Sequence, residues 1–183
     1  MKCLHLAAVF TAVFMLASCS ETKVEVPEPF ALTEEAIGRY CGMNVLEHSG
    51  PKGQIILDHI REPIWFSSAR DAVAFTMLPE EPRNIAAVYV SDMAKASDWE
   101  RPGAENWIDA HGAFFVIGSS LLGGMGAPET VPFSTQAAAD EFAAEHGGTV
   151  VAFADIPEDY VLGGADENPP ATEGMPPHAD GTH

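Results

Sequence analysis

Basic residues are scarce in this chain of 183 residues, which has 9 Lys and Arg against 27 Asp and Glu and a formal net charge of −18. Neutralising phosphates needs clustered Lys and Arg, so the composition excludes a basic nucleic-acid-binding protein. Long hydrophobic runs are lacking too, because no apolar stretch reaches the ~18 residues of a membrane-spanning helix. Hydrophobic residues still make up 46% of the chain, which is enough for one or two small cores.

Local signatures of catalysis are also absent. The chain has no Cys-x-x-Cys, no His-Glu-x-x-His, no Gly-x-Ser-x-Gly and no phosphate-binding glycine loop. A cysteine nucleophile with a distant histidine as its base would leave no such signature, so that class stays open. With no positive sign of catalysis, we predict that the chain is not an enzyme.

The N-terminus has the pattern of an export signal. An apolar stretch runs from Leu6 to Leu16, interrupted only by Thr11, and it is too short to span a bilayer. The run Leu16-Ala17-Ser18-Cys19 resembles the lipobox of bacterial lipoproteins. This resemblance implies removal of residues 1–18 and acylation of Cys19, with ordinary signal cleavage as the alternative. In bacterial lipoproteins the residue that follows the acylated cysteine influences the membrane to which the protein is sorted. Ser20 at this position suggests the outer membrane, with the protein facing the periplasm.

Cysteine is scarce as well, and the three residues have different fates. Cys3 leaves with the signal and Cys19 is acylated, so Cys41 is the only free thiol in an oxidising compartment. An unpartnered thiol there is buried and inert, paired with another molecule, catalytic, or a metal ligand.

Composition divides the rest of the chain. Residues 19–36 are polar, contain prolines and read as a membrane-proximal linker. Residues 163–183 are rich in proline, glycine and acids, and read as a disordered acidic tail. The segment between them is predicted to fold as two halves, 37–98 and 99–162.

An internal repeat supports the division into halves. Phe66 and Phe75 recur as Phe133 and Phe142, in both cases 67 positions later. In each copy a serine or threonine stands where a helix cap belongs, and an alanine-rich run follows it. Each half is therefore predicted as two strands, a helix and a strand. The expected elements are 53–57, 64–66, 69–78 and 85–90 in the first half, and 113–118, 131–133, 136–146 and 149–153 in the second. The predicted fold class is α+β, with two related ββαβ halves that are each a small sheet covered by a helix.

Two segments carry soft sulfur donors. If Cys41-Gly42-Met43 is extended, Cys41 and Met43 point to the same face, because side-chain direction repeats every two residues. Met125 stands among glycines at an expected loop tip, where local packing gives no reason for a methionine. A thiolate with thioethers selects Cu(I) over Mg²⁺, Ca²⁺ or Mn²⁺. The alternatives are that Met43 fills a core gap and that Met125 folds back onto the body.

Histidines are weaker candidates because none shows a ligand spacing. His111 lies near an expected strand and could supply a nitrogen, but an exposed or structural role is the simpler interpretation. Met175, His178 and His183 in the tail could bind copper loosely, although a solubilising tail explains them equally well.

Several short motifs in order carry a family resemblance across residues 37–162. They are Cys41-Gly42-Met43, Gln54-Ile55, Trp107-Ile108-Asp109-Ala110, Met125-Gly126, Val131-Pro132-Phe133 and Gly147-Gly148. Together they resemble the NosL family, whose members are lipoprotein accessory factors of nitrous oxide reductase. The fold of that family is similar to part of the organomercurial lyases, but a fold does not fix the chemistry.

The resemblance implies a periplasmic, membrane-anchored Cu(I) metallochaperone that delivers copper for the copper centres of nitrous oxide reductase. It implies nitrous oxide reductase and its ABC-type maturation complex as partners, and Cys41, Met43 and Met125 as copper ligands. His111 does not match, because a basic residue is more usual at its position, and Gly124 stands where family members often have proline. The alternatives are a general periplasmic copper-buffering lipoprotein and a thiol enzyme of the organomercurial lyase type.

Overall fold

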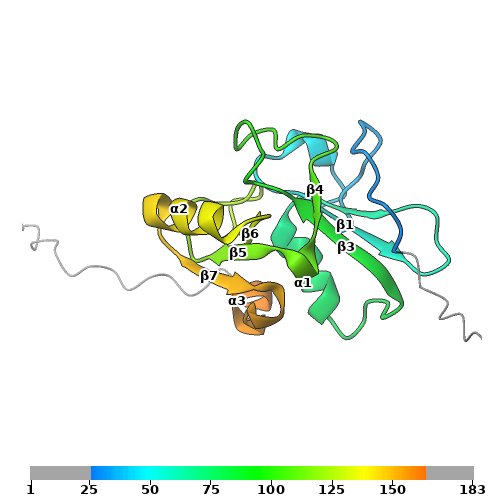
Figure 1. Ribbon diagram of the computed structural model, residues 1–183. Helices are drawn as coiled ribbons and strands as arrows, with labels where there is room; N and C mark the ends of the chain where they lie inside the picture. The colour runs from blue at the N-terminus through cyan, green and yellow to red at the C-terminus, as the bar shows by residue number, and fades with distance from the viewer. Residues whose placement is uncertain (1–25, 164–183) are drawn as a thin grey trace, which may run out of the picture.

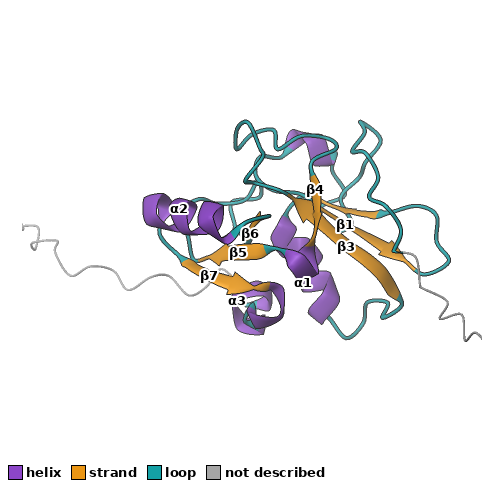
Figure 2. Cartoon of the chain, in the orientation of Figure 1, coloured by secondary structure: helices purple, strands orange, loops and turns teal. Residues whose placement is uncertain are grey.

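Two small antiparallel sheets organise residues 26–163, the part of the chain described by the computed structural model (Figure 1). The first sheet has the strand order β2-β1-β3-β4, with bounds β1 Gly53–Leu57, β2 Ile64–Phe66, β3 Ile85–Ser91 and β4 Trp107–Asp109. The second has the order β6-β5-β7, with bounds β5 Phe114–Ile117, β6 Val131–Phe133 and β7 Thr149–Ala152. The helices are α1 Ala69–Met77, α2 Gln136–His146 and α3 Glu158–Leu162 (Figure 2). None of these helices is long and apolar enough to cross a membrane.

The predicted ββαβ repeat is confirmed. In both sheets the first strand of the half lies between the other two, and both pairings are antiparallel. The offset of 67 residues holds from the start of β2 and β6 to the helices. The caps match as well: Ser68 Oγ accepts from the backbone of Asp71 at 3.0 Å, and Thr135 Oγ1 accepts from Ala138 at 3.3 Å. These oxygens satisfy amides that the first helical turn leaves unpaired.

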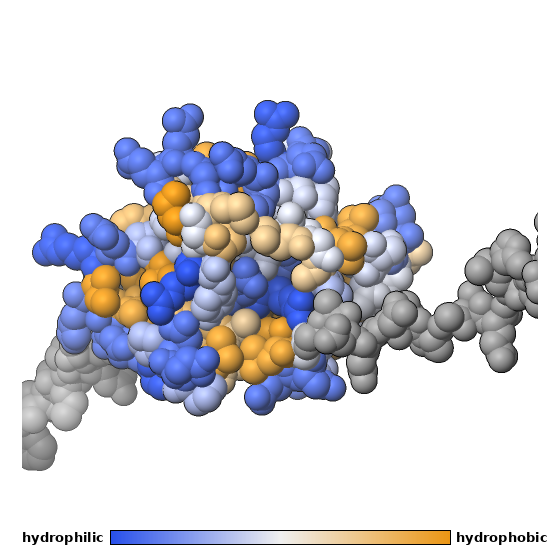
Figure 3. Space-filling view, turned by 180° about the vertical axis from the view of Figure 1, so that it is seen from behind, coloured by the Kyte–Doolittle hydropathy of each residue, from blue (hydrophilic) through white to orange (hydrophobic). Residues whose placement is uncertain are grey.

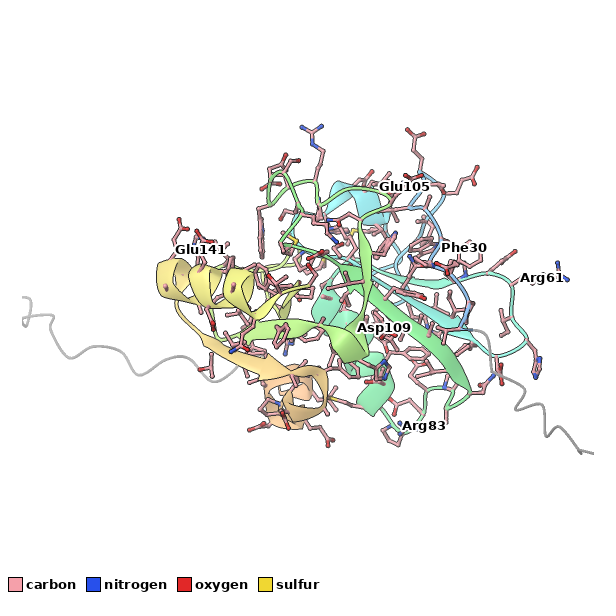
Figure 4. All side chains as sticks on the ribbon, in the orientation of Figure 1. Phe30, Arg61, Arg83, Glu105, Asp109 and Glu141 are labelled. Carbon is pink, nitrogen blue, oxygen red and sulfur yellow. The ribbon has the colours of Figure 1, made fainter. Side chains whose placement is uncertain are left out.

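The boundary between the halves differs from the prediction in one strand. β4 falls in the predicted second half, yet it pairs with β3 and extends the first sheet. A short 3-10 turn, Ala110–Gly112, then leads from β4 into β5. Figure 4 shows Asp109, the last residue of β4, in the middle of the molecule where the two sheets approach each other.

Helix α1 lies in a core that both sheets share. Gly53 of β1 packs so closely on Ala72 of α1 that a β-carbon at residue 53 would collide with it. Phe115 of β5 and Val161 of α3 are buried in the same cluster. Helix α2 covers the other face of the second sheet, where Ala139 packs in a separate cluster. The halves therefore pack as one body through α1.

The N-terminal segment 27–36 covers the face of the first sheet opposite α1. The amide side chain of Gln54 on β1 forms two hydrogen bonds with the backbone of Phe30, at 2.8 and 2.9 Å. The hydroxyl of Tyr89 on β3 donates to Pro27 O at 2.7 Å. Leu32 and Ala36 are buried, and Phe30 lies beside the first sheet in Figure 4. The folded body thus begins near residue 27 rather than at 37. The predicted signal peptide, the acylated Cys19 and most of the tail lie outside the described residues.

Candidate functional site

Residues 37–44 form a tight turn that carries Cys41. Ile37 bridges to Asn44, and Gly38 N donates to Met43 O at 2.9 Å. Gly42 closes the turn with a φ of +66°, a left-handed conformation that glycine adopts without steric cost. The segment is therefore not extended, and the expectation that Cys41 and Met43 share one face through strand alternation is wrong.

The sulfur of Cys41 rests on Gly38. A β-carbon at residue 38 would lie 2.6 Å from Sγ, so the missing side chain of glycine makes the space for the thiol. Sγ also lies 3.9 Å from the carbonyl oxygen of Met43. Cys41 is a free, partly exposed cysteine, so the thiol is neither sealed in the core nor spent in a disulfide.

The loop 122–128 presents Met125 at its tip. Leu122 forms a β-bridge with Pro128, and Gly123 N donates to Ala127 O at 2.9 Å. Gly126, directly after Met125, has a left-handed backbone conformation with a φ of +76°. Met125 is 52% exposed. At residue 124 a β-carbon would come within 2.6 Å of His48 Cβ. This glycine allows the loop from the second half to dock on the first half.

One pocket of about 230 Å³ brings Cys41 and Met125 together. These residues are 84 positions apart, and the pocket that they line lies between the first turn of α1 and the two loops. Met43 does not line it and is 40% exposed. The complete lining is Tyr40, Cys41, Ser68, Arg70, Asp71, Gly123, Met125, Ala127, Pro128 and Glu129.

Two ionisable residues are buried here, Glu129 of the pocket lining and Lys52. Burial raises the pKa of Glu129 to about 8, against the opposing effect of hydrogen bonds from the backbone amides of Arg70 and Thr130. Burial lowers the pKa of Lys52 to about 8, although the charge of Glu129 opposes the shift. Burial also raises the pKa of Asp71, which lines the pocket from α1. Glu129 is therefore mostly protonated at neutral pH.

The donor set limits what the pocket can hold. Within residues 26–163, no group of three or more His, Cys, Asp and Glu side chains could hold a metal ion. Beside Cys41, the soft donor that the pocket lining offers is the sulfur of Met125. Thiolate and thioether donors suit soft ions such as Cu(I).

Comparison with known proteins decides the family. A protein-family model described as NosL matches residues 29–161. The chain belongs to the NosL family. The resemblance found in the sequence is thereby confirmed, and the match spans both halves and the pocket.

Named NosL proteins match along most of their length. The copper-binding lipoprotein NosL of Achromobacter cycloclastes is 43% identical over 97% of this chain and 89% of its own length. That of Stutzerimonas stutzeri is 37% identical over 82% of this chain and 78% of its own length. The crystal structure of the copper chaperone NosL from Shewanella denitrificans has a TM-score of 0.67 and 32% identity, and the match covers 72% of this chain and 96% of that one. The α+β fold is therefore that of the NosL structures.

His111 lies away from the pocket. Its Nδ1 is 3.0 Å from Asp109 Oδ1, and its ring packs on Phe153 with centroids 4.8 Å apart. It is not among the residues that line the NosL pocket, which agrees with the structural interpretation. Met175, His178 and His183 lie outside the described residues.

Sequence reasoning missed Glu129 and Lys52. Glu129 stands between the glycine-rich loop and the apolar strand β6, where an acidic residue is normally exposed. Lys52 stands between Pro51 and Gly53 in an expected turn, where a lysine is normally exposed. Its burial follows from three backbone carbonyls that converge on Nζ, those of His48, Ser49 and Gly50, and no local pattern announces that convergence.

Large exposed apolar side chains accompany the two sulfurs. In the space-filling view of Figure 3, apolar atoms gather in patches among polar ones on the face opposite that of Figure 1. Most of the large apolar residues that are exposed within residues 26–163 lie close in sequence to Cys41 or Met125. They are Ile37, Tyr40, Met43 and Leu46 around Cys41, and Leu122 and Met125 in the loop 122–128.

Proposed function

We propose that this chain is a membrane-anchored copper chaperone that binds Cu(I) as cargo and passes it to a partner. One observation carries the proposal: Cys41 and Met125, distant in sequence, line one partly exposed pocket. The relatives named as copper-binding lipoproteins and as a copper chaperone support it. Those names describe binding and delivery rather than catalysis, so we infer that the chain is not an enzyme.

Cu(I) suits these donors better than other ions do. The thiol of Cys41 loses its proton when it binds the metal, and the resulting thiolate neutralises the single charge of the ion. Met125 supplies a neutral thioether from the loop 122–128, which packs closely on His48 at Gly124. Two sulfur donors leave the ion open to an incoming ligand, which is what transfer requires.

Met43 is proposed as a third sulfur donor. Its backbone is fixed by the hydrogen bond from Gly38, and the residue is 40% exposed. Methionine has three rotatable bonds and adapts easily, so its thioether reaches toward Cys41 by rotation once copper is bound.

The proposed location is the periplasmic side of a membrane, held by acylation at Cys19. The partners that we propose are nitrous oxide reductase and its ABC-type maturation complex, with the outer membrane as the site of anchoring. The exposed apolar residues near Cys41 and Met125 in the sequence support direct contact with another protein, because exposed apolar patches mark interaction sites. The net charge of −18 favours a partner with a basic surface.

Competition with a Cu(I) chelator under anaerobic conditions tests the assignment. Cys41→Ser should weaken binding by several orders of magnitude, and Met125→Leu by about tenfold, since leucine keeps the apolar volume but removes the sulfur. Met93→Leu is the matched control, because Met93 packs beside the second core cluster and should leave binding unchanged. Unaltered affinity in Cys41→Ser would reject the site.

A pull-down with the maturation complex separates a chaperone from a copper buffer. A chaperone retains the complex on the wild-type chain and loses it when the exposed apolar residues Leu46 and Leu122 are replaced by aspartate. A buffer binds copper equally well and shows no retention in either case.

A further inference from the structure

Glu129 presents an unused hydrogen-bond acceptor at the pocket. Its side chain is buried, with 1% of its surface exposed. Oε1 accepts from the backbone amides of Arg70 and Thr130 at 2.8 and 2.9 Å. Oε2 is buried beside Gly123, where a β-carbon would lie 2.6 Å from it, and it has no hydrogen-bond partner among residues 26–163. Glu129 is one of the residues that line the pocket of Cys41 and Met125.

The hydrogen bonds that the neighbouring cations donate go to other groups, and Arg70 Nε, which is also buried, has no partner among residues 26–163. Lys52 Nζ donates to the carbonyls of three loop residues, His48, Ser49 and Gly50. The guanidinium of Arg70 donates to the carbonyls of Tyr160 and Gly163, both at 3.1 Å. Neither cation donates to Oε2 of Glu129. Buried polar groups in folded proteins usually have a partner, so this oxygen points to a donor that enters the pocket from outside.

We propose that the group that receives copper is a histidine side chain of the partner, which enters the pocket with one ring nitrogen on the Cu(I) held by Cys41 and the other ring N–H donating to Glu129 Oε2. This inference rests on the proposed function and adds the chemistry of the recipient. It assigns Glu129 the role of orienting the incoming ligand without binding copper itself.

The imidazole side chain of histidine can bind Cu(I) through one ring nitrogen and donate a hydrogen bond to Glu129 through the other. A histidine that binds a metal normally donates its second ring N–H to a carboxylate, a carbonyl or water, and this fixes its tautomer and orientation. A thioether or thiolate binds Cu(I) but has no second donor. A lysine or arginine donates hydrogen bonds but, when charged, has no free electron pair for the ion. The volume of about 230 Å³ accommodates a five-membered ring.

The exchange balances as follows. The Cu–N bond to the entering ring forms, and the bond from copper to the Met125 sulfur breaks. No electrons are transferred, because copper stays monovalent. Glu129 holds a proton at neutral pH, since burial raises its pKa to about 8. That proton leaves to water when the ring N–H takes its place beside Oε2, so one proton is released for each ring bound.

Imidazole and 1-methylimidazole test the inference with the full chain in detergent, loaded with Cu(I) under anaerobic conditions. Bound through its free nitrogen, 1-methylimidazole has no N–H to donate. At pH 8.5, where Glu129 is ionised, the wild-type chain should bind imidazole about tenfold more tightly than 1-methylimidazole, as expected for a hydrogen bond to a charged group. Copper K-edge absorption reports the new nitrogen ligand.

Glu129→Gln removes the acceptor and keeps the shape. The two backbone amides hold the amide oxygen of glutamine at the position of Oε1, which places the NH₂ group, a donor, at the position of Oε2. The preference for imidazole should fall below twofold, while Cu(I) affinity without imidazole stays within twofold of wild type. Asp71→Asn is the matched control, since it removes the other carboxyl of the pocket and should keep the preference.

Two failures are distinguishable. Cu(I) binding that does not depend on Cys41 would reject the proposed function. Cys41-dependent binding with equal affinities for the two imidazoles, or a preference that Asp71→Asn abolishes and Glu129→Gln retains, would overturn this inference alone.

Discussion

Gly38→Ala tests whether the backbone beneath Cys41 holds its sulfur in place. The added β-carbon would lie 2.6 Å from Sγ, whereas ordinary contact begins near 3.4 Å, so the sulfur has to move by about 0.8 Å. Side-chain rotation is the cheapest way to move it, and a displacement of ~30° from a staggered rotamer costs about 0.5–1.5 kcal/mol. If the copper-bound state carries this cost, affinity for Cu(I) falls by about two- to twelvefold.

Chelator competition measures that loss, with Gly112→Ala as the control. A β-carbon at residue 112 would meet nothing within 4 Å, so this variant reports only the general effect of removing a glycine. The rate at which a thiol reagent labels Cys41 gives a second readout that needs no copper, and it should change in Gly38→Ala alone. If the two alanine variants have equal affinities and equal labelling rates, the sulfur does not rest on Gly38.

Further predictions concern the docked loop, the helix cap and the buried carboxyl. Gly124→Ala forces the loop 122–128 away from His48, because its β-carbon would lie 2.6 Å from His48 Cβ. Its Cu(I) affinity should fall to the level of Met125→Leu, with no further loss when both substitutions are combined; additive losses would show that the loop keeps its place. Ser68→Ala removes the cap on α1 and should lower the free energy of unfolding by about 1 kcal/mol in a urea titration, and an unchanged midpoint would contradict the capping role. Glu129 keeps its proton in the folded state up to a pKa of about 8 but loses it near 4.5 when unfolded. Its contribution to the free energy of unfolding is therefore complete below pH 4.5 and declines by about 1.4 kcal/mol per unit as the pH rises to 8. Glu129→Gln should flatten this decline in denaturation curves recorded across that range, and parallel curves for the two proteins would refute it.

The repeat made the fold predictable from sequence. Two phenylalanines at a constant offset, with a hydroxyl cap and an alanine-rich run after each, identified β2, α1, β6 and α2 within one residue of their observed ends. These are local signals, set by periodicity and capping. The position of β4 was not predictable in the same way, because its pairing with β3 is decided by tertiary contacts that no local pattern encodes.

The site was predictable in part. Glycine neighbours and the single free thiol pointed to Cys41 and Met125, which line one pocket in the structure. The turn at Gly42 was missed because the short motif fits a strand equally well, and only its φ of +66° distinguishes the two. Glu129 was missed because an acidic residue beside a loop is usually exposed. Its burial depends on amides from α1, 59 positions away.

The attachment of residues 27–36 to the first sheet limits the distance between the folded body and a membrane anchor at Cys19. Pro27 is already fixed by Tyr89, so an acyl group on Cys19 would be joined to the body by eight residues, which span at most about 29 Å. A tether running to residue 36 would allow about twice that distance. An acyl anchor at Cys19 would therefore keep the pocket within a thin layer above the lipid headgroups, and a partner that receives copper from it would have to reach that layer.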